Sequence, residues 1–202
     1  RNPEHLDASE LARGTVESLA ENTSDAVVCS LFWGAVAGIP GLLVHRGINT
    51  LAAMVGYRNP RSERFGTASA KLDDAVAYLP ARLSGVISSG LAATVGGSPT
   101  NAWRVMRRDA RNHPSPNGGW CEAAWAGALN THLGGASTYH GRVEERPRLG
   151  DPDTPAPDAH TIERASTLVS AVTVASAGLA AAGSLLARRL VSAAVARRAG
   201  SR

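Results

Sequence analysis

The stretch Glu17-Ser-Leu-Ala-Glu21-Asn-Thr-Ser-Asp25 runs directly into an uncharged segment from Ala26 to His45. In a helix of 3.6 residues per turn, Glu17, Glu21 and Asp25 follow one another on one face at i, i+4 and i+8. Like charges at that spacing destabilise an isolated helix by about 0.2–0.5 kcal/mol per pair. A row of carboxylates at the edge of an apolar segment therefore indicates a bound cation, an amine or a proton to be moved. Three acids on a solvated helix face are the plainer alternative.

A second apolar segment lies near the C-terminus. Residues 165–187 carry no charge, and a helix of this length, about 34 Å, crosses the hydrocarbon core of a bilayer. Four arginines follow it, which by the positive-inside rule predicts a cytoplasmic C-terminus. These are Arg188, Arg189, Arg197 and Arg198. An alanine-rich helix buried in a soluble bundle is the alternative.

The segment from Ala26 to His45 is interrupted by glycines and by Pro40. It is either one kinked membrane span or a re-entrant pair of half-helices. A single crossing would put the carboxylate row and the polar loop after His45 on opposite sides, whereas a hairpin would leave them together. Residues 75–95 contain Arg82 and are expected to form a marginal span or an interfacial helix.

Strand patterns are sparse, so the sequence predicts an all-α fold: a helical integral membrane protein with substantial polar loops. Residues 1–150 form the expected core, and residues 161–202 form the C-terminal membrane helix with its basic tail. Between them, residues 151–160 alternate Asp and Pro, which is typical of a flexible linker.

Several functional classes are disfavoured. The net charge is +4, but Lys71 is the one lysine, aromatic residues make up 4% of the chain and no dense basic run occurs, which argues against nucleic-acid binding. Cys29 and Cys121 lack metal-site spacing, so we interpret them as buried, reduced residues. A Walker loop, GxGxxG, HExxH and GxSxG are absent from the sequence, so any nucleotide would bind in an unconventional site.

Three polar stretches contain the remaining candidates. Arginines beside glycines favour contact with phosphate or carboxylate groups. The pair Asp73–Asp74 is suited to hold Mg²⁺ through one carboxylate plus water, although a solvated acidic pair at a helix start explains it as well. His113 lies in a Pro- and Gly-rich loop and has an ordinary pKa near 6.5 that suits proton transfer.

These motifs together resemble the CbiB/CobD family of cobalamin biosynthesis, the adenosylcobinamide-phosphate synthases, which are integral membrane proteins. The resemblance runs in order over about residues 1–150 and continues into the C-terminal apolar helix. It rests on residues 15–25 (TVESLAENTSD), 49–51 (NTL), 54–59 (MVGYRN), 63–66 (ERFG), 72–74 (LDD), 80–82 (PAR), 109–111 (DAR), 113–117 (HPSPN), 119–120 (GW), Tyr139 and 141–142 (GR). Family members are usually longer at the N-terminus, so we expect this chain, which opens at Arg1, to be a fragment that lacks membrane segments.

The resemblance implies an ATP-dependent amide ligation. The amine of aminopropanol phosphate, or of an ethanolamine analogue, would be joined to a propionate carboxyl of adenosylcobyric acid. The expected cofactors are ATP and Mg²⁺, and the expected partners are the corrinoid and amino-alcohol substrates, other membrane enzymes of the pathway and the lipid bilayer, with no nucleic acid. The implied location is the cell (inner) membrane, with several crossings.

On this resemblance we assign hypothetical roles. Glu21 and Asp25 bind the amine and its proton, Asp73 and Asp74 hold Mg²⁺, and Asp109 and His113 shape the reacting centre. The remaining residues would bind substrate and phosphate groups: Glu17, Asn22, Asn49, Arg58, Asn59, Arg64, Asn117 and Arg142.

The chain also departs from the family pattern. Where the family usually reads Asn-Thr-Leu-Asp-Ala-Met, this sequence has Ala52 in place of the acid. Loss of one acid at a metal or substrate site costs transition-state stabilisation, so a degenerate, non-catalytic corrinoid-binding or scaffold protein of the membrane is the alternative. A soluble, basic helical protein is a further one.

Overall fold

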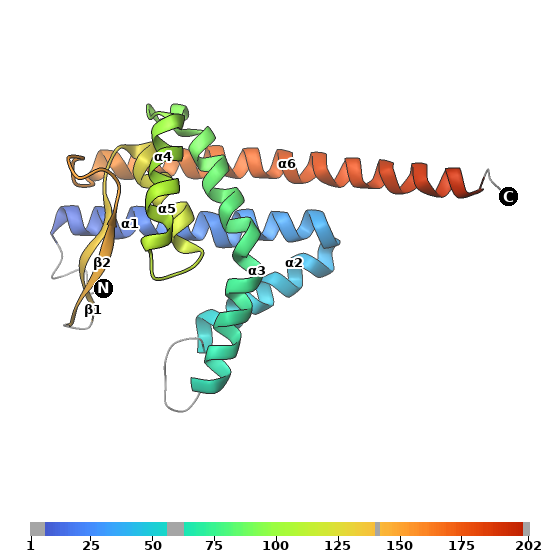
Figure 1. Ribbon diagram of the computed structural model, residues 1–202, viewed down its shortest axis with the longest axis horizontal. Coiled ribbons are helices and arrows are strands. Elements are labelled where there is room, and N and C mark those ends of the chain that lie inside the picture. Colours follow the sequence, from blue (N-terminus) through green and yellow to red (C-terminus); the bar gives the residue numbers. More distant parts are fainter. Residues whose placement is uncertain (1–6, 56–62, 140–141, 200–202) are drawn as a thin grey trace.

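The computed structural model describes residues 7–55, 63–139 and 142–199, and within these ranges the chain is mostly helical (Figure 1). The helical elements are α1 (Ala8–Asn22), the π-helical turn η2 (Thr23–Val28), α2 (Cys29–Val55), α3 (Glu63–Gly90), the 3-10 turn η3 (Ala92–Val95), α4 (Pro99–Asp109), the 3-10 turn η4 (Ala110–Asn112), α5 (Gly118–Leu129) and α6 (Ala159–Ala199). Two strands, β1 (Leu133–Tyr139) and β2 (Arg142–Leu149), pair as an antiparallel hairpin.

The central element is α5, which is buried along almost its whole length. Its small residues let neighbouring helices approach closely. A Cβ on Gly127 would lie 2.7 Å from the Cα of Ala102 in α4. Trp125 is fully buried and donates from its indole to Ser88 Oγ of α3 at 3.1 Å. The core therefore lies where α3, α4 and α5 meet.

The first two helices form a hairpin. Asp7 caps α1 in a reciprocal capping box with Glu10, the arrangement that satisfies free N–H groups at a helix start. Further along, Gly38 has φ of 66° and interrupts α2, and the chain turns back at this point (Figure 1). Asp25 and Arg46 flank the apolar segment and interact electrostatically. Of the two predicted arrangements, this geometry matches the hairpin.

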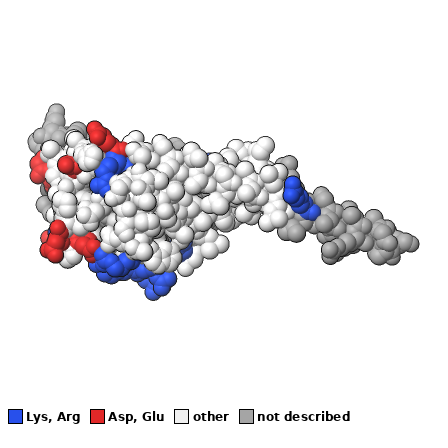
Figure 2. Space-filling model, turned by 90° about the horizontal axis from the view of Figure 1, so that it is seen from above, with Lys and Arg blue, Asp and Glu red and all other residues white. Residues whose placement is uncertain are grey.

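Apolar side chains cover the outside of the hairpin and of α6. Ile39 is 75% exposed and Val174 is 73% exposed. Within the described residues, two helical stretches are long and apolar enough to cross a membrane, Ala8–Val55 and Ala159–Ala187. Charged residues gather at one end of the surface in Figure 2, and the middle is largely free of them on the face shown. The second helix contains the predicted span 165–187, whereas residues 75–95 fall mainly in α3 and bury Ala81, Ser84 and Ser88 in the bundle.

The predicted all-α fold is confirmed in the described residues, and the β-hairpin is a small addition to it that the sequence did not predict. The sequence predicted a polar turn at residues 138–147. Glycines lie near the start of β1, and β2 contains several charged residues and Pro147, so neither segment has the alternating apolar and polar pattern of a strand. In the structure the two strands pair with each other, and hydrogen bonds connect β1 to α1. Arg13 donates to the carbonyl oxygens of Gly134 and Ala136, each at 2.6 Å.

The Asp/Pro segment predicted as a flexible linker is attached to the body of the protein. Thr131 Oγ1 donates to the Pro155 carbonyl at 2.8 Å, and His132 Nδ1 lies 3.1 Å from the Thr154 carbonyl. Asp151 pairs with Arg104 and Arg108 of α4. These contacts fix the point at which α6 begins.

Candidate functional site

Acidic side chains from four elements converge beside the hairpin. Glu21, at the end of α1, interacts with Glu122 of α5, with Asp25 and with His113. Asp25, in the π-helical turn, interacts with Asp73 and Asp74 of α3. The carboxylates predicted from separate parts of the sequence therefore form one acidic centre.

The π-helical turn contributes to this arrangement. It begins at Thr23, between Glu21 and Asp25, and its i→i+5 hydrogen bonds are wider than those of an α-helix. Glu21 interacts with the α5 side of the centre, whereas Asp25 interacts with α3. Single π-helical turns occur frequently at functional sites.

The inner part of the site is a cluster of Glu21, His113 and Glu122. Their potential ligand atoms all lie within 4.8 Å of one another. His113 Nε2 is 3.4 Å from Glu122 Oε1, and the two side chains are 4% and 2% exposed. Burial lowers the pKa of His113, but the contact with Glu122 and its negative charge outweigh burial, so the pKa is raised overall.

The outer part of the site is formed by Asp73 and Asp74. Burial raises the pKa of both carboxyl groups, and the charge of Asp73 adds to the rise at Asp74. Asn49 donates from Nδ2 to Asp73 Oδ1 at 3.4 Å and accepts from Arg46 at 3.2 Å. The end of the hairpin is thus connected directly to the acidic pair.

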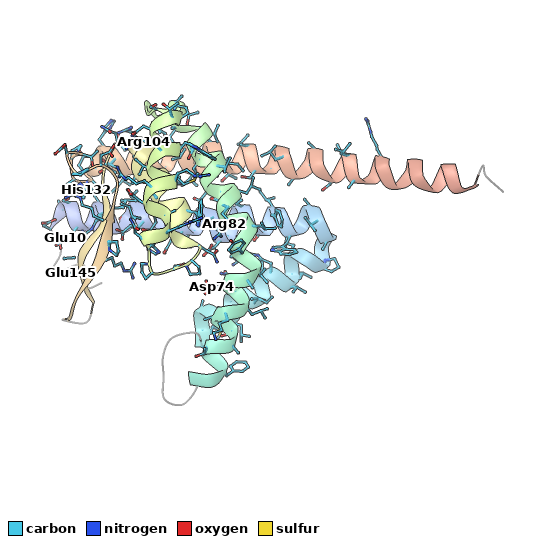
Figure 3. The ribbon with its side chains drawn as sticks, in the orientation of Figure 1. Glu10, Asp74, Arg82, Arg104, His132 and Glu145 are labelled. Carbon is cyan, nitrogen blue, oxygen red and sulfur yellow. The ribbon has the colours of Figure 1, made fainter. Side chains whose placement is uncertain are left out.

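Asn117 connects α3 to the loop before α5. It donates to the main-chain carbonyl of Asp74 at 2.9 Å and accepts from Arg82 Nη1 at 3.0 Å. The Arg82 guanidinium lies over the ring of Tyr78, 3.4 Å from its centroid, and 4.9 Å from that of Trp120. Figure 3 shows Asp74 and Arg82 along α3, with Arg104 and His132 away from them.

A cavity of about 220 Å³ adjoins this network. Its lining residues are Tyr78, Arg82, Ala110, Arg111, His113, Ser115, Pro116 and Trp120. Two guanidinium groups and two aromatic rings in one wall suit an anionic ligand with an apolar part. His113 belongs both to this wall and to the buried cluster.

The structure brings together Glu21, Asp25, Asn49, Asp73, Asp74, His113 and Asn117. Other predicted residues have different partners. Glu17 accepts from the Gly134 N–H at 2.9 Å, Asn22 donates to the Ser18 carbonyl within α1, and Asp109 pairs with Arg108 and accepts from the Gly150 N–H. These contacts are structural and lie outside the acidic centre.

Four predicted phosphate-binding residues have no described side-chain position. Arg58 and Asn59 lie outside the described residues. Arg64 falls in α3 and Arg142 in β2, but their side chains are outside the described part of the structure.

Four charged residues of the site were not among the predicted ones: Arg46, Arg82, Arg111 and Glu122. Glu122 was detectable in principle, because a carboxylate in the small, apolar run of α5 has to find a partner when buried. The position of Arg46 follows from the reversal at Gly38, which the sequence leaves open.

The fold and the site define a helical protein with an apolar hairpin and a buried acid–histidine centre. The family described as CobD/Cbib protein matches residues 1–169. This chain therefore belongs to the CobD/CbiB family of cobalamin biosynthesis, as the motifs predicted. No solved structure matches the chain.

Similar proteins come from several bacteria, and each of the following is named "Cobalamin biosynthesis protein CobD". The protein of Mycobacterium tuberculosis (strain H37Rv) is 51% identical over 155 residues, which are 77% of this chain and 50% of the relative. That of Rhodobacter capsulatus is 50% identical over 149 residues, 74% of this chain and 46% of the relative. That of Brucella anthropi is 43% identical over 188 residues, 92% of this chain and 58% of the relative. The chain thus spans about half the length of the curated relatives it matches.

Proposed function

We propose that this chain carries the reacting centre of an adenosylcobinamide-phosphate synthase. This enzyme would join the amine of aminopropanol phosphate, or of an ethanolamine analogue, to a propionate carboxyl of adenosylcobyric acid at the expense of ATP. Family membership supports the pathway. The observation that carries the reaction class is the position of His113, which touches both the acidic centre and the arginine-lined cavity.

The two parts of the site suit the two ends of an amino-alcohol phosphate. Arg82 and Arg111 in the cavity wall supply guanidinium groups for a phosphate. Asp25 and the neighbouring Asp73 and Asp74 favour a positively charged ammonium group. We assign Asp25 to hold the amine and to accept its proton at a carboxylate oxygen as the amide forms.

The residues of α3 also fit the magnesium ion that the family implies. Asp73 and Asp74 offer hard oxygen ligands, and Mg²⁺ is usually bound through one or two carboxylates with water and substrate phosphates completing its shell. The raised pKa of each carboxyl indicates a site where a cation would stabilise the ionised form. Bound there, Mg²⁺ would neutralise phosphate charge.

The apolar surfaces suit insertion in a membrane. The hairpin of α1 and α2 and the exposed apolar face of α6 would lie in the bilayer, and the acidic centre would lie at its surface. The arginines that follow residue 187 would place the C-terminus in the cytoplasm. Partition of the purified chain into the aqueous rather than the detergent phase would contradict this placement.

Complementation tests the proposed reaction. The chain is expressed in a strain that lacks its own synthase and is supplied with cobyric acid, and cobinamide phosphate is measured by mass spectrometry. Asp25→Asn is expected to abolish product formation. Glu163→Gln removes a carboxylate on the exposed surface of α6 and is expected to leave it unchanged. Full product formation by Asp25→Asn would exclude the assigned role.

A further inference from the structure

The cluster of Glu21, His113 and Glu122 has the dimensions of a metal site. Histidine nitrogens and carboxylate oxygens bind Zn²⁺ at about 2.0–2.2 Å. Two ligands at that distance and at a tetrahedral angle are therefore about 3.4 Å apart. His113 Nε2 and Glu122 Oε1 are separated by 3.4 Å, and a Glu21 oxygen completes a group within 4.8 Å. A small movement of Glu21, which is less buried than the other two, brings all three to one ion.

The two most buried members have polar atoms without hydrogen bonds. Within the described residues, His113 Nε2 and Glu122 Oε1 make no aligned hydrogen bond despite their proximity. A buried carboxylate oxygen without such a partner is costly. Coordination of a cation satisfies both atoms at once when the ring proton lies on Nδ1, because Nε2 and the carboxylate oxygen then each offer a lone pair.

The histidine ring is held in place from its other side. Its Nδ1 lies 3.4 Å from the Ser115 carbonyl and 3.1 Å from the Ser115 N–H. A Cβ on Gly118 would lie 3.2 Å from Cε1 of the ring, so the start of α5 packs against it closely. When Nδ1–H donates to the carbonyl, Nε2 presents a lone pair to Glu122, which is the usual orientation of a metal-bound histidine. When the Ser115 N–H donates to Nδ1, Nε2 carries the proton and the pair needs no metal.

We propose that Glu21, His113 and Glu122 form a binding site for one divalent transition-metal ion, with Zn²⁺ as the preferred occupant. Imidazole together with carboxylates suits such ions better than Mg²⁺, which takes oxygen ligands. Three protein ligands leave a coordination position open, as in catalytic zinc sites. This site is distinct from the magnesium position at Asp73 and Asp74, and its existence does not depend on the proposed reaction.

Cobalt substitution tests the proposal without any substrate. The chain is purified in detergent, stripped of metal and titrated with Co²⁺, whose visible absorption reports coordination by protein ligands. We expect one Co²⁺ per chain, displaced by Zn²⁺ and not by a large excess of Mg²⁺. His113→Gln and Glu122→Gln are each expected to weaken Co²⁺ binding by at least about 100-fold.

Matched controls separate this site from other candidates. His45→Gln removes another buried histidine whose ring nitrogens lack hydrogen-bond partners in the described structure, and Asp73→Asn alters the magnesium position. Both are expected to bind Co²⁺ as the parent does. Circular dichroism checks that each variant folds, and Glu21→Gln, at the least buried ligand, provides the test if the substitutions in the core do not fold.

The opposite results would overturn the proposal. The first is the absence of visible Co²⁺ absorption in the parent. The second is that all three ligand variants bind Co²⁺ as tightly as the parent does. The third is that Asp73→Asn alone loses Co²⁺ binding. Each would leave the cluster a metal-free pair of histidine and carboxylate. Because no substrate is present, a failure here is distinct from a failure of the complementation experiment.

Discussion

Asn117, at the start of α5, donates a hydrogen bond of 2.9 Å from its side-chain amide to the main-chain carbonyl of Asp74 in α3. The oxygen of the same amide accepts from Arg82. One side chain thus aligns the acidic pair of α3 with the arginine that lines the cavity. Its loss should therefore affect the site as well as the stability of the fold.

We expect Asn117→Ala to lower the free energy of unfolding by about 1–3 kcal/mol, because it leaves partly buried polar groups without partners. The variant should also lose most product formation, since Arg82 and Asp74 are no longer held together. Denaturant unfolding and mass spectrometry of cobinamide phosphate measure the two effects.

A matched variant separates positioning from stability. Asn101 likewise donates from its side-chain amide to a main-chain carbonyl, that of Gly127 in α5, at 3.1 Å, but it is not part of the acidic centre. Asn101→Ala should destabilise the fold to a similar degree and retain activity. If both variants lose activity in proportion to stability, Asn117 has no positioning role.

His132 predicts a pH dependence of stability. Burial lowers its pKa, and the hydrogen bond to the Thr154 carbonyl only partly opposes this. The unfolded chain therefore takes up the proton first as the pH falls below about 6.5. The contribution of His132 to the free energy of unfolding is fully present above that pH and is lost as the pH falls toward the lower pKa of the folded state.

Denaturant unfolding of the parent and of His132→Asn between pH 5 and pH 8 measures this contribution. The free energy of unfolding of the variant should depend less on pH. Identical profiles would assign the dependence to other groups.

Features set by local sequence were predicted better than features set by contacts between distant segments. The apolar segment from Ala26 to His45, the helix from residue 165 and the acids from Glu21 to Asp74 were predictable, because uncharged length and carboxylate spacing are local properties of a sequence. The choice between a kinked span and a hairpin was not, because the sequence does not fix the backbone conformation at Gly38. Glu122 and Arg82 became site residues only through packing of α3 against α5, which depends on contacts between distant segments. The β-hairpin was missed for a different reason, since the pairing of β1 with β2 and the hydrogen bonds from Arg13 of α1 override weak local strand preferences.

Gly38 offers a test of the hairpin. Its φ of 66° is unfavourable for a residue with a Cβ by roughly 1–2 kcal/mol. Gly38→Ala should therefore destabilise the turn, weaken the approach of Asp25 to Arg46 and reduce product formation.

Gly47 is the matched control for this variant, because it lies in the same helix and a Cβ there meets nothing within 4 Å. Gly47→Ala should leave activity unchanged and stabilise the helix slightly. Double-cysteine variants at positions 25 and 46 measure the distance in each background. Unchanged crosslinking in Gly38→Ala would show that the reversal does not require this backbone conformation.

Ala52 offers the sharpest test of whether the chain is a competent synthase. It lies in α2, half-buried and one turn beyond Asn49, whose amide donates to Asp73. An acid at this position, which the family usually has, would add a carboxylate near the proposed magnesium position. We expect Ala52→Asp to raise product formation about 10-fold or more, equivalent to about 1.4 kcal/mol in the activation free energy, and to increase its dependence on Mg²⁺.

Ala52→Asn is the control, because asparagine has nearly the same shape as aspartate without the charge, and it should have little effect. Equal gains in both variants would rule out an electrostatic cause, and binding of adenosylcobyric acid without product in every variant would favour the non-catalytic alternative.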